Sequence, residues 1–327
     1  MNENIITAFE ALAIQTKQCP RPGSSYRFRS HETVAKILKS LDFEINNSDQ
    51  IKDIKGIGKS TVKRVDEILE SGTLSEIKLK NTKLNTLKDL ERITGIGPVK
   101  AKKLFEKGFT LQKILSEYNN SSLEESFTNH QLLGIKHFYD LESRIPYNEI
   151  SLIDNYLKKE LKKITEIVEL EICGSYRRKA NTSGDIDVLF YSNCEKEQKE
   201  FLPKFLEHLN EIGFLVDHLT SLDSETKYMG MCKYKTNPIR RIDIRYIPKN
   251  SFGSAKLYFT GSGDFNKNMR SFANSKGYTI NEYGIYKLKP DKTKGIKIKT
   301  ITEKDIFSVL KLEYVEPENR LSSYKFD

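Results

Sequence analysis

The sequence predicts an α+β protein of more than one domain, in which a basic helical region is followed by a mixed α/β sheet. Two observations predict this division. The N-terminal third contains two Gly-Ile-Gly segments, each followed by a basic pattern with apolar residues at helical spacing. From about residue 165 onwards, short β-branched and alternating runs recur between helical stretches. With 327 residues, the chain is long enough for two or more domains of ordinary size.

The composition is that of a globular protein with a basic surplus. Hydrophobic residues make up 37% of the chain and charged residues 30%, and 54 Lys and Arg oppose 45 Asp and Glu, for a formal net charge of +9. Most of this surplus lies in the first 120 residues. We therefore expect that region to provide much of the binding to a polyanion such as nucleic acid.

The cysteines and the apolar runs indicate the compartment and argue against a membrane protein. Cys19, Cys173, Cys194 and Cys232 lie far apart, without a CxxC pair, which argues against a zinc site or a disulfide scaffold and indicates a reducing compartment. The apolar stretch at residues 5–14 lacks a basic leader and is interrupted by a glutamate. No apolar run approaches the roughly 20 residues of a membrane span. We expect a soluble, intracellular protein without a membrane partner.

Two segments of the N-terminal third, IKGIGKSTVKRVDEIL (54–69) and ITGIGPVKAKKLFEKG (93–108), have the sequence form of a helix-hairpin-helix. The glycines allow the backbone to approach a phosphate, and the following helix presents unpaired N–H groups. Such a motif grips the DNA backbone without reading bases. One copy alone is also compatible with an ordinary glycine turn, but two copies favour a nucleic-acid partner. The apolar positions at helical spacing are Val62, Val65 and Ile68 in the first segment, and Val99, Leu104 and Phe105 in the second.

The remaining patterns give the order of the elements. ETVAKILKSL (32–41) predicts an amphipathic helix after a breaker-rich stretch at 19–27, and SLIDNYLKKELKKI and KEFLPKFLEHLNEIG predict two further helices. Strands are predicted for EIVELEICGS, DIDVLFYS, FLVDHL, RRIDIRYIP and AKLYFTGS (255–262). We assign residues 1–78 to a helical domain and residues 79–140 to a second helical unit. Residues 141–252 form a sheet domain, and residues 253–327 a small α/β C-terminal subdomain.

Three aspartates form the first candidate site. Asp185 and Asp187 flank Ile186 on a predicted strand, so both carboxylates face one side. At about 4 Å two such charges repel by roughly 1 kcal/mol in water and about 4 kcal/mol at an effective dielectric of 20, which a divalent cation between them offsets. Oxygen-only ligands select Mg²⁺ or Mn²⁺. Asp243 has the same placement in RRIDIRYIP, although an aspartate between Arg241 and Arg245 is also typical of a surface ion-pair ladder.

The loop before the aspartate pair contains groups that bind phosphate. Gly174 and Ser175 follow a predicted strand, Arg178 can add a charge-assisted contact, and Gly184 precedes Asp185. Anion-binding groups beside paired carboxylates favour a complex of metal and triphosphate. Three carboxylates suffice for two-metal catalysis, in which one ion activates the attacking oxygen and the other stabilises the leaving oxygen.

The pattern G-S-x(8)-G-D-x-D, followed by a third Asp on a later strand, resembles the nucleotidyltransferase palm. Together with the two hairpin motifs, RRIDIRYIP, LYFTGSGDFNKNMR and GYTINEYGIY, it resembles the family X DNA polymerases over residues 26–320, and the polymerase beta type in particular. The resemblance implies a template-directed polymerase for short gaps in DNA repair. It also implies gapped or nicked duplex DNA and dNTPs as partners, two Mg²⁺ ions for which Mn²⁺ can substitute, a monomeric state, and repair ligases or nucleases as companions.

The resemblance further assigns roles around the reacting groups. Asp185 and Asp187 would bind both metals, and Asp243 would bind the catalytic metal and help to activate the primer 3′-hydroxyl. Arg245 would be a switch that pairs with Asp187 in an open state, with Glu282 and Tyr283 supporting the closed state. The incoming nucleotide would be bound by Arg144, Gly174, Ser175, Arg178, Gly184, Tyr258, Phe259, Gly261 and Asn266.

DNA contacts follow from the same resemblance. Each hairpin would be assisted by a Na⁺ or K⁺ ion on backbone carbonyls, those of Lys52, Ile54 and Ile57 in the first and of Glu91, Ile93 and Ile96 in the second. DNA itself would be contacted by Arg27, Gly56, Gly58, Lys59, Lys63, Arg64, Gly95, Gly97, Arg241 and Arg270. Without the resemblance, residues 265–272 are as typical of an ordinary basic amphipathic helix as of a DNA-binding one. Tyr258 and Phe259 are likewise as typical of core aromatics as of nucleotide contacts.

The chain departs from the family pattern at two places. Gly263 stands where the family often has an Asp, so one nucleotide contact is in doubt. Arg64 stands where the lyase-competent members have the lysine that forms a Schiff base, and a guanidinium does not deprotonate in proteins. Lys63 is adjacent but points about 100° away around the helix, and Ser60 replaces a further lysine. We expect 5′-deoxyribose-phosphate lyase activity to be weak or absent.

Two other functions compete with the leading one. Template-independent terminal transfer belongs to relatives with a longer loop between palm strands, whereas residues 223–240 are short here. A catalytically silent DNA-end-binding protein would use the hairpins alone, and the presence of all three aspartates argues against it.

Overall fold

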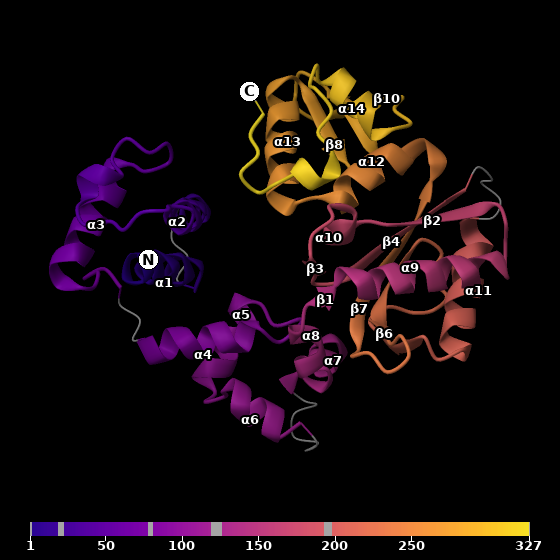
Figure 1. Cartoon of the computed structure of the whole chain (residues 1–327), viewed down its shortest axis with the longest axis horizontal. Coiled ribbons are helices and arrows are strands. Elements are labelled where there is room, and N and C mark those ends of the chain that lie inside the picture. Colours follow the sequence, from indigo (N-terminus) through magenta and orange to yellow (C-terminus); the bar gives the residue numbers. More distant parts are fainter. Residues whose placement is uncertain (1, 19–22, 78–80, 119–125, 193–197, 327) are drawn as a thin grey trace. The chain divides into compact units, whose positions relative to one another are not determined.

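The computed structural model describes residues 2–18, 23–77, 81–118, 126–192 and 198–326 (Figure 1). These residues form two compact units, 1–136 and 137–327. Cys19, Cys194 and the expected boundary at residues 78–79 lie outside the described residues. None of the helices in the described ranges combines the length and apolar character that a bilayer crossing requires.

The described residues of the first unit contain helices and connecting turns but no strand. Phe9, Leu38 and Val65 are buried together and hold its first three helices against one another. The helix predicted at residues 32–41 is longer than expected, because Gly23 in the left-handed region lets it begin already at Ser24. The elements are α1 (Glu3–Gln18), α2 (Ser24–Lys39), η1 (Ser48–Gln50), α3 (Lys59–Ser71), α4 (Asn81–Glu91), α5 (Pro98–Glu106), α6 (Leu111–Ser116) and α7 (Asn129–Lys136).

The two Gly-Ile-Gly segments have the same local geometry. Gly56 and Gly95 lie in the left-handed region, at φ 101° and 88°. A Cβ on Gly56 would approach the Cδ1 of Ile37 to 2.7 Å, but this methyl is the end of a flexible side chain, so it is the positive φ that favours glycine here. Gly58 and Gly97 then lead into α3 and α5 without a side-chain cap. This leaves N–H groups in the first turn of both helices available to a ligand, although Pro98, the first residue of α5, has none.

The apolar face predicted for the second of these helices is partly wrong. Val99 is 71% exposed, whereas Leu104 is buried as expected and Ala101, which the pattern did not include, is buried as well. Val99 lies about 200° around α5 from Ala101, which is two residues later and fully buried, so its side chain points away from the core. Its exposure beside the hairpin glycines adds an apolar surface to the tip of this motif.

The second unit is built on a five-stranded sheet of order β2-β4-β7-β6-β5. β4 and β7 pair in parallel, and the other neighbours are antiparallel. Ile153 and Phe205, from the helices α9 and α11, pack with Phe190 and Ile244 on one face of the sheet. The elements are α9 (Tyr147–Lys162), β2 (Val168–Ile172), β4 (Ile186–Ser192), α11 (Gln198–Glu211), β5 (Leu215–His218), β6 (Lys227–Cys232) and β7 (Arg240–Pro248).

A smaller sheet of order β10-β9-β8 completes this unit. Phe265 and Ile285 are buried with Phe307 in its core. The other face of the large sheet is covered by the first helix of this part, because Ala255 packs on Leu189. The elements are α12 (Lys249–Thr260), α13 (Gly263–Ser275), β8 (Tyr278–Asn281), β9 (Gly284–Leu288), β10 (Lys294–Ile298) and α14 (Glu303–Val309).

The strand predicted at residues 255–262 is wrong, because these residues form the end of α12 and the turn after it. Tyr258 and Phe259 gave the segment its β-like appearance. The residues that this helix buries are mostly small, Ser251, Ser254 and Ala255 among them, and they recur at helical spacing. Packing of these small residues against the large sheet outweighs the β propensity of two aromatics.

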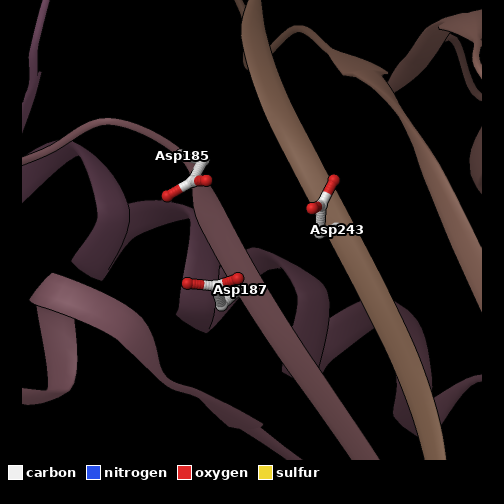
Figure 2. Close-up of side chains that lie close together, drawn as sticks. All are labelled: Asp185, Asp187 and Asp243. Carbon is white, nitrogen blue, oxygen red and sulfur yellow. The ribbon is translucent and has the colours of Figure 1, made fainter. Parts of the chain in front are cut away.

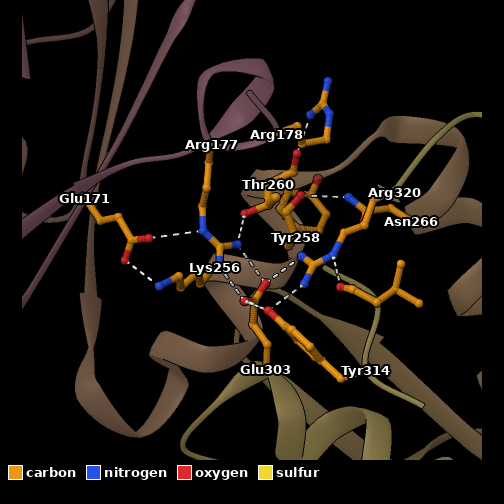
Figure 3. Close-up of polar contacts among 11 residues, drawn as sticks. Glu171, Arg177, Arg178, Lys256, Tyr258, Thr260, Asn266, Glu303, Tyr314 and Arg320 are labelled. Atoms are coloured by element: carbon orange, nitrogen blue, oxygen red, sulfur yellow. Dashed lines mark hydrogen bonds and ion pairs between the residues drawn. The ribbon is translucent and has the colours of Figure 1, made fainter. Parts of the chain in front are cut away.

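A buried carboxylate joins the elements of the second unit (Figure 3). Glu303 of α14 accepts two hydrogen bonds from Arg177, at 2.6 and 2.9 Å, and one from the fully buried Arg320 at 2.6 Å. Tyr314 donates to the same carboxylate at 3.1 Å. Burial raises the pKa of Glu303, but the hydrogen bonds from both arginines outweigh it and hold the pKa below the usual value.

Arg177 extends this network into the large sheet. Its Nε lies 3.1 Å from Glu171 on β2, and its Nη1 donates to Thr260 at the end of α12 at 2.5 Å. Lys256 of α12 pairs with the other oxygen of Glu171 at 2.7 Å. The network therefore fixes α12 and α14 to the strand that leads into the candidate site.

Replacing Glu303 with alanine should destabilise the protein by about 3–5 kcal/mol, because the fully buried Arg320 then keeps its charge without a counter-charge and Arg177 keeps only Glu171. The melting temperature, followed by circular dichroism, should fall by roughly 6–20 °C. Glu313→Ala, which removes an exposed carboxylate, is the matched control and should change it by no more than about 2 °C. Equal melting temperatures for the two variants would contradict this account of the network.

Candidate active site

Three carboxylates converge at one end of the large sheet (Figure 2). Asp187 on β4 is directly opposite Asp243 on β7 in the parallel register, and Asp185 lies just before β4. One oxygen from each lies within 4.8 Å of those of the other two. Ile186, between the first two, is buried in the core. Strand alternation thus aims both aspartates to the same side, and strand pairing brings the third beside them.

The mutual repulsion of these groups changes their acidity. Burial, followed by the charges of Asp185 and Asp243, raises the pKa of Asp187 from 3.8 to about 8, against the opposing effect of Arg241. Burial and the charge of Asp243 also raise the pKa of Asp185. A site that offers only carboxylate oxygens and in which negative charge is this unfavourable fits a hard divalent cation.

Gly174 brings the backbone close to Asp187. It opens the short helix α10 (Gly174–Arg177), which follows β2, at φ 60°, and a Cβ at this position would collide with the Oδ2 of Asp187. The N–H of Cys173 donates to the carbonyl of Asp187 at 2.8 Å. The helix start and the carboxylate are therefore held together, and only glycine fits between them.

Two arginines lie beside the carboxylates without an ion-pair partner among the described residues. Arg178 donates to Ser175 at 3.0 Å and to the carbonyl of Thr260. Arg144 precedes the two-residue ladder of β1 (Ile145–Pro146) with β3 (Thr182–Ser183), and it donates to the carbonyl and hydroxyl of Thr182 at 3.0 and 3.2 Å. Because both guanidiniums contact only neutral oxygens, their charge remains available to an anion.

The predicted glycines fit closely around these arginines. A Cβ on Gly184 would approach Arg144 to 3.0 Å, and one on Gly261 would approach Arg178 to 3.2 Å. Gly261 also has φ 65°, which favours glycine independently of space. The structure thus brings Arg144, Arg178, Ser175 and the glycines of the predicted nucleotide site together around the aspartates.

Sequence reasoning missed the pair that positions Arg144. Arg240, at the start of β7, is 4% exposed and donates to both carboxylate oxygens of Glu149, at 2.8 and 2.9 Å. It also donates to the carbonyl of Ser143 at 2.9 Å. The strand that carries Asp243 is thereby tied to the residue before Arg144. The sequence did contain a signal for a buried, paired arginine, because Arg240 falls on the apolar face of its strand together with Ile242.

The predicted switch residue has a different neighbour in this structure. Arg245 lies over the ring of Phe259, 5.8 Å from its centroid, while Arg241 contacts both oxygens of Asp243 at 3.2 Å. Phe259 packs beside the buried Leu189, but Tyr258 is 38% exposed. The alternative reading of these two aromatics as core residues therefore fits Phe259 in part and Tyr258 not at all.

Asn266 and Arg270 share one face of α13, as their spacing predicts. Asn266 donates to the carbonyl of Tyr258 at 2.7 Å, and Arg270 to the carbonyl of Asn266 at 3.3 Å. A small surface cavity lies between Tyr258, Asn266, Arg270 and Ile280. Glu282 and Tyr283 lie in the turn between β8 and β9, where Tyr283 is 47% exposed.

The predicted DNA-binding residues of the first unit surround its hairpins. Lys59 and Lys63 are exposed on α3, whereas Arg64 points inwards and binds both oxygens of Glu76. Arg27 is exposed on α2. Of the predicted ion-binding carbonyls, those of Ile54 and Ile93 each accept a hydrogen bond of 2.9 Å from the N–H three residues later, that of Ile57 and of Ile96 respectively. The corresponding residues Lys52 and Glu91 have side chains that pair with Asp49 and Lys17.

Four family descriptions match successive parts of this chain. Residues 1–74 match a helix-hairpin-helix domain and residues 88–142 the fingers domain of DNA polymerase lambda. Residues 144–249 match the DNA polymerase beta palm, and residues 255–321 the DNA polymerase beta thumb. The aspartates, Arg144 and Arg178 all lie within the palm match, and Asn266 and Arg270 within the thumb match.

Curated proteins resemble the chain over nearly its whole length. It is 30% identical to DNA polymerase lambda of Arabidopsis thaliana, over 91% of this chain and 58% of that protein. It is 30% identical to DNA polymerase lambda of Rattus norvegicus, over 95% of this chain and 55% of that protein. DNA nucleotidylexotransferase of Xenopus laevis is 24% identical, over 98% of this chain and 68% of that protein. The chain thus spans somewhat more than half the length of the two polymerases.

Asp187→Asn should stabilise the protein when divalent cations are removed with EDTA at pH 8.5. Since the pKa of Asp187 is raised from 3.8 to about 8, the native state of the wild type binds the extra proton and loses stability as the pH rises through this range. The variant should melt at least about 2–4 °C higher than the wild type under these conditions. Mg²⁺ should raise the melting temperature of the wild type clearly more than that of the variant. A lower melting temperature of the variant in EDTA would contradict the repulsion described here.

Proposed function

The chain belongs to the family X DNA polymerases, and on this premise we propose that it is a template-directed polymerase that fills short gaps during DNA repair. The convergence of Asp185, Asp187 and Asp243 beside two uncommitted arginines carries the proposal. The substrates are dNTPs and the primer end of gapped or nicked duplex DNA. Repair ligases or nucleases would act before or after it.

The three aspartates would hold two Mg²⁺ ions, with Asp185 and Asp187 shared and Asp243 private to one. When bound, such ions supply Lewis acidity to the attacking and leaving oxygens. Asp243 would also help to take the proton from the primer 3′-hydroxyl. The repulsion among the carboxylates supports this assignment, because cation binding removes it.

The arginines would bind the triphosphate of the incoming nucleotide. Arg178 and Ser175 already contact each other at 3.0 Å at the start of α10, and Gly174 and Gly184 let the backbone approach the same space. Arg144 lies beside Gly184 and would contribute a second guanidinium, in a position set by Arg240 and Glu149. The base and sugar would lie against Tyr258, Phe259 and Asn266, with Arg270 on the template side.

A change of partner by Arg245 would accompany closing. Here it lies over Phe259, and in an open state it would pair with Asp187, which competes with cation binding. Glu282 and Tyr283 would support the closed state from the turn after β8. The hairpins of the first unit, assisted by monovalent ions on their carbonyls, would hold DNA backbone phosphates on both sides of the gap.

A specific observation supports terminal transfer as the second candidate, namely the 24% identity to a nucleotidylexotransferase. The connection between β6 and β7 argues against it. It comprises only residues 233–239, whereas the expectation from the sequence is a longer loop at this place in the relatives that carry out terminal transfer. Extension with and without a template strand distinguishes the two functions.

Asp243→Ala should lower the rate of primer extension on a one-nucleotide gap by at least about 10²–10³-fold, because it removes a group that acts on the reacting oxygen. The wild type should extend the primer on this substrate and not on single-stranded DNA. Asp223→Ala, which removes an exposed aspartate outside the site, is the control and should retain activity. Wild-type extension that is independent of the template would favour terminal transfer, and no extension at all would favour a silent end-binding protein.

The first unit should show little or no 5′-deoxyribose-phosphate lyase activity. Arg64 keeps its charge, and both its donors on this side are occupied by Glu76. Borohydride trapping on an incised abasic duplex should give no strong covalent adduct. A strong adduct that disappears in Lys63→Arg would contradict this expectation and assign the amine to Lys63.

A further inference from the structure

One hairpin of the second unit has an unusual charge. β9 and β10, with the turn between them, form what we call the lysine hairpin, residues 287–299. Its sequence, KLKPDKTKGIKIK, contains six lysines and one carboxylate, that of Asp291. The surplus of the whole 327-residue chain is only +9, so more than half of this net charge is concentrated in one hairpin. The lysines are Lys287, Lys289, Lys292, Lys294, Lys297 and Lys299.

These lysines are not neutralised by the fold. Only Lys297 turns inwards, where it donates to Ser251 at 3.0 Å, and Lys294 lies 3.6 Å from the centroid of the Tyr286 ring. The remaining lysines are exposed, and no ion pair to any of the six is present in the described residues. Asp291 is occupied within the turn, because it accepts from the N–H and hydroxyl of Thr293 at 2.9 and 2.6 Å.

Several lysines elsewhere on this unit pair with carboxylates. Lys158 pairs with Asp154 at 2.7 Å, Lys204 with Glu200 at 3.5 Å and Lys267 with Asp264 at 3.0 Å. A lysine-rich composition alone would spread such pairs over the hairpin as well. The hairpin instead presents like charges that repel one another, an arrangement that binding of an anion relieves.

The lysine hairpin lies away from the residues that face the nascent base pair. α13, which carries Asn266 and Arg270, packs against β8 at one edge of the small sheet. β10 is the opposite edge, and β9 lies between them (Figure 1). An anion bound by the hairpin is therefore a different group from the triphosphate and from the base pair at α13.

We propose that the lysine hairpin is a second contact for the phosphate backbone of DNA, beyond the base pair that is being formed. Several spaced lysines suit a polyanion with regular charges. Protection of an open sheet edge explains lysines on β10 alone, but Lys287, Lys289 and Lys292 lie on β9 and the turn. The same distribution disfavours an acidic peptide added to β10, since it would leave those three unmatched.

The test compares two variants of the full chain in which four lysines are replaced by glutamine. The hairpin variant changes Lys287, Lys289, Lys292 and Lys299, and leaves Lys294 on Tyr286. The control variant changes four exposed lysines of α9 and α11, Lys158, Lys159, Lys162 and Lys204, for the same change in net charge. Fluorescence anisotropy measures binding of a gapped duplex with long arms on both sides between 50 and 300 mM salt, after circular dichroism has verified folding.

The hairpin variant should bind the gapped duplex at least about tenfold more weakly than the wild type at 150 mM salt. The magnitude of the slope of log K against log salt should fall by about 2–3, because each lost phosphate contact lowers it by about 0.9. The control should stay within about twofold. With arms too short to reach the hairpin, the variant and wild type should bind alike. Equal affinity and slope for the hairpin and control variants would overturn the proposal. So would a hairpin variant that binds DNA like the wild type but aggregates, which would assign the lysines to edge protection. A hairpin variant that binds DNA like the wild type but no longer binds a poly-glutamate peptide would overturn it as well, in favour of an acidic peptide. The measurement needs no turnover, so it is independent of the proposed polymerase activity.

Discussion

Repulsion among three carboxylates within 4.8 Å is the interaction on which the rest of the second unit depends. The parallel pairing of β4 and β7 fixes Asp187 opposite Asp243, and neither can move away because α9 and α11 pack the other face of the sheet. Burial of Asp187, and then the charges of Asp185 and Asp243, raise its pKa. A divalent cation between the carboxylates would remove this repulsion, which the fold imposes on the site whether or not a cation is bound.

The basic residues around this centre divide according to what they bind. Arg177, Arg240 and Arg320 are bound by buried glutamates and hold helices, strands and loops in place. Arg144 and Arg178 donate only to hydroxyl and carbonyl oxygens, which orient a guanidinium without neutralising it. The first group makes the site rigid, and the second keeps its charge available to an anion. This division connects the stability of the unit with its chemistry.

Much of the site follows from local patterns. Strand alternation predicts that Asp185 and Asp187 share a side, and Gly-Ile-Gly predicts the two hairpins, because both depend only on neighbours in the chain. The errors arise where packing decides. Residues 255–260 are helical because small residues pack on the large sheet. Val99 is exposed because it lies on the side of its helix opposite the buried Ala101. Arg240 and Glu149 lie 91 positions apart, so no local pattern pairs them.

The sequence by itself determined which groups carry the charge: three aspartates on strand positions, arginines in glycine-rich turns, and lysines gathered in one hairpin. Alternation and turn chemistry are local properties, and a short stretch of chain suffices to specify them. Only the tertiary structure decided which of these charges are neutralised. Ion pairing depends on distance in space. It is the fold that placed Glu303 against Arg177 and Arg320, and that left the lysines of the hairpin without an ion pair in the part of the chain that the structure describes.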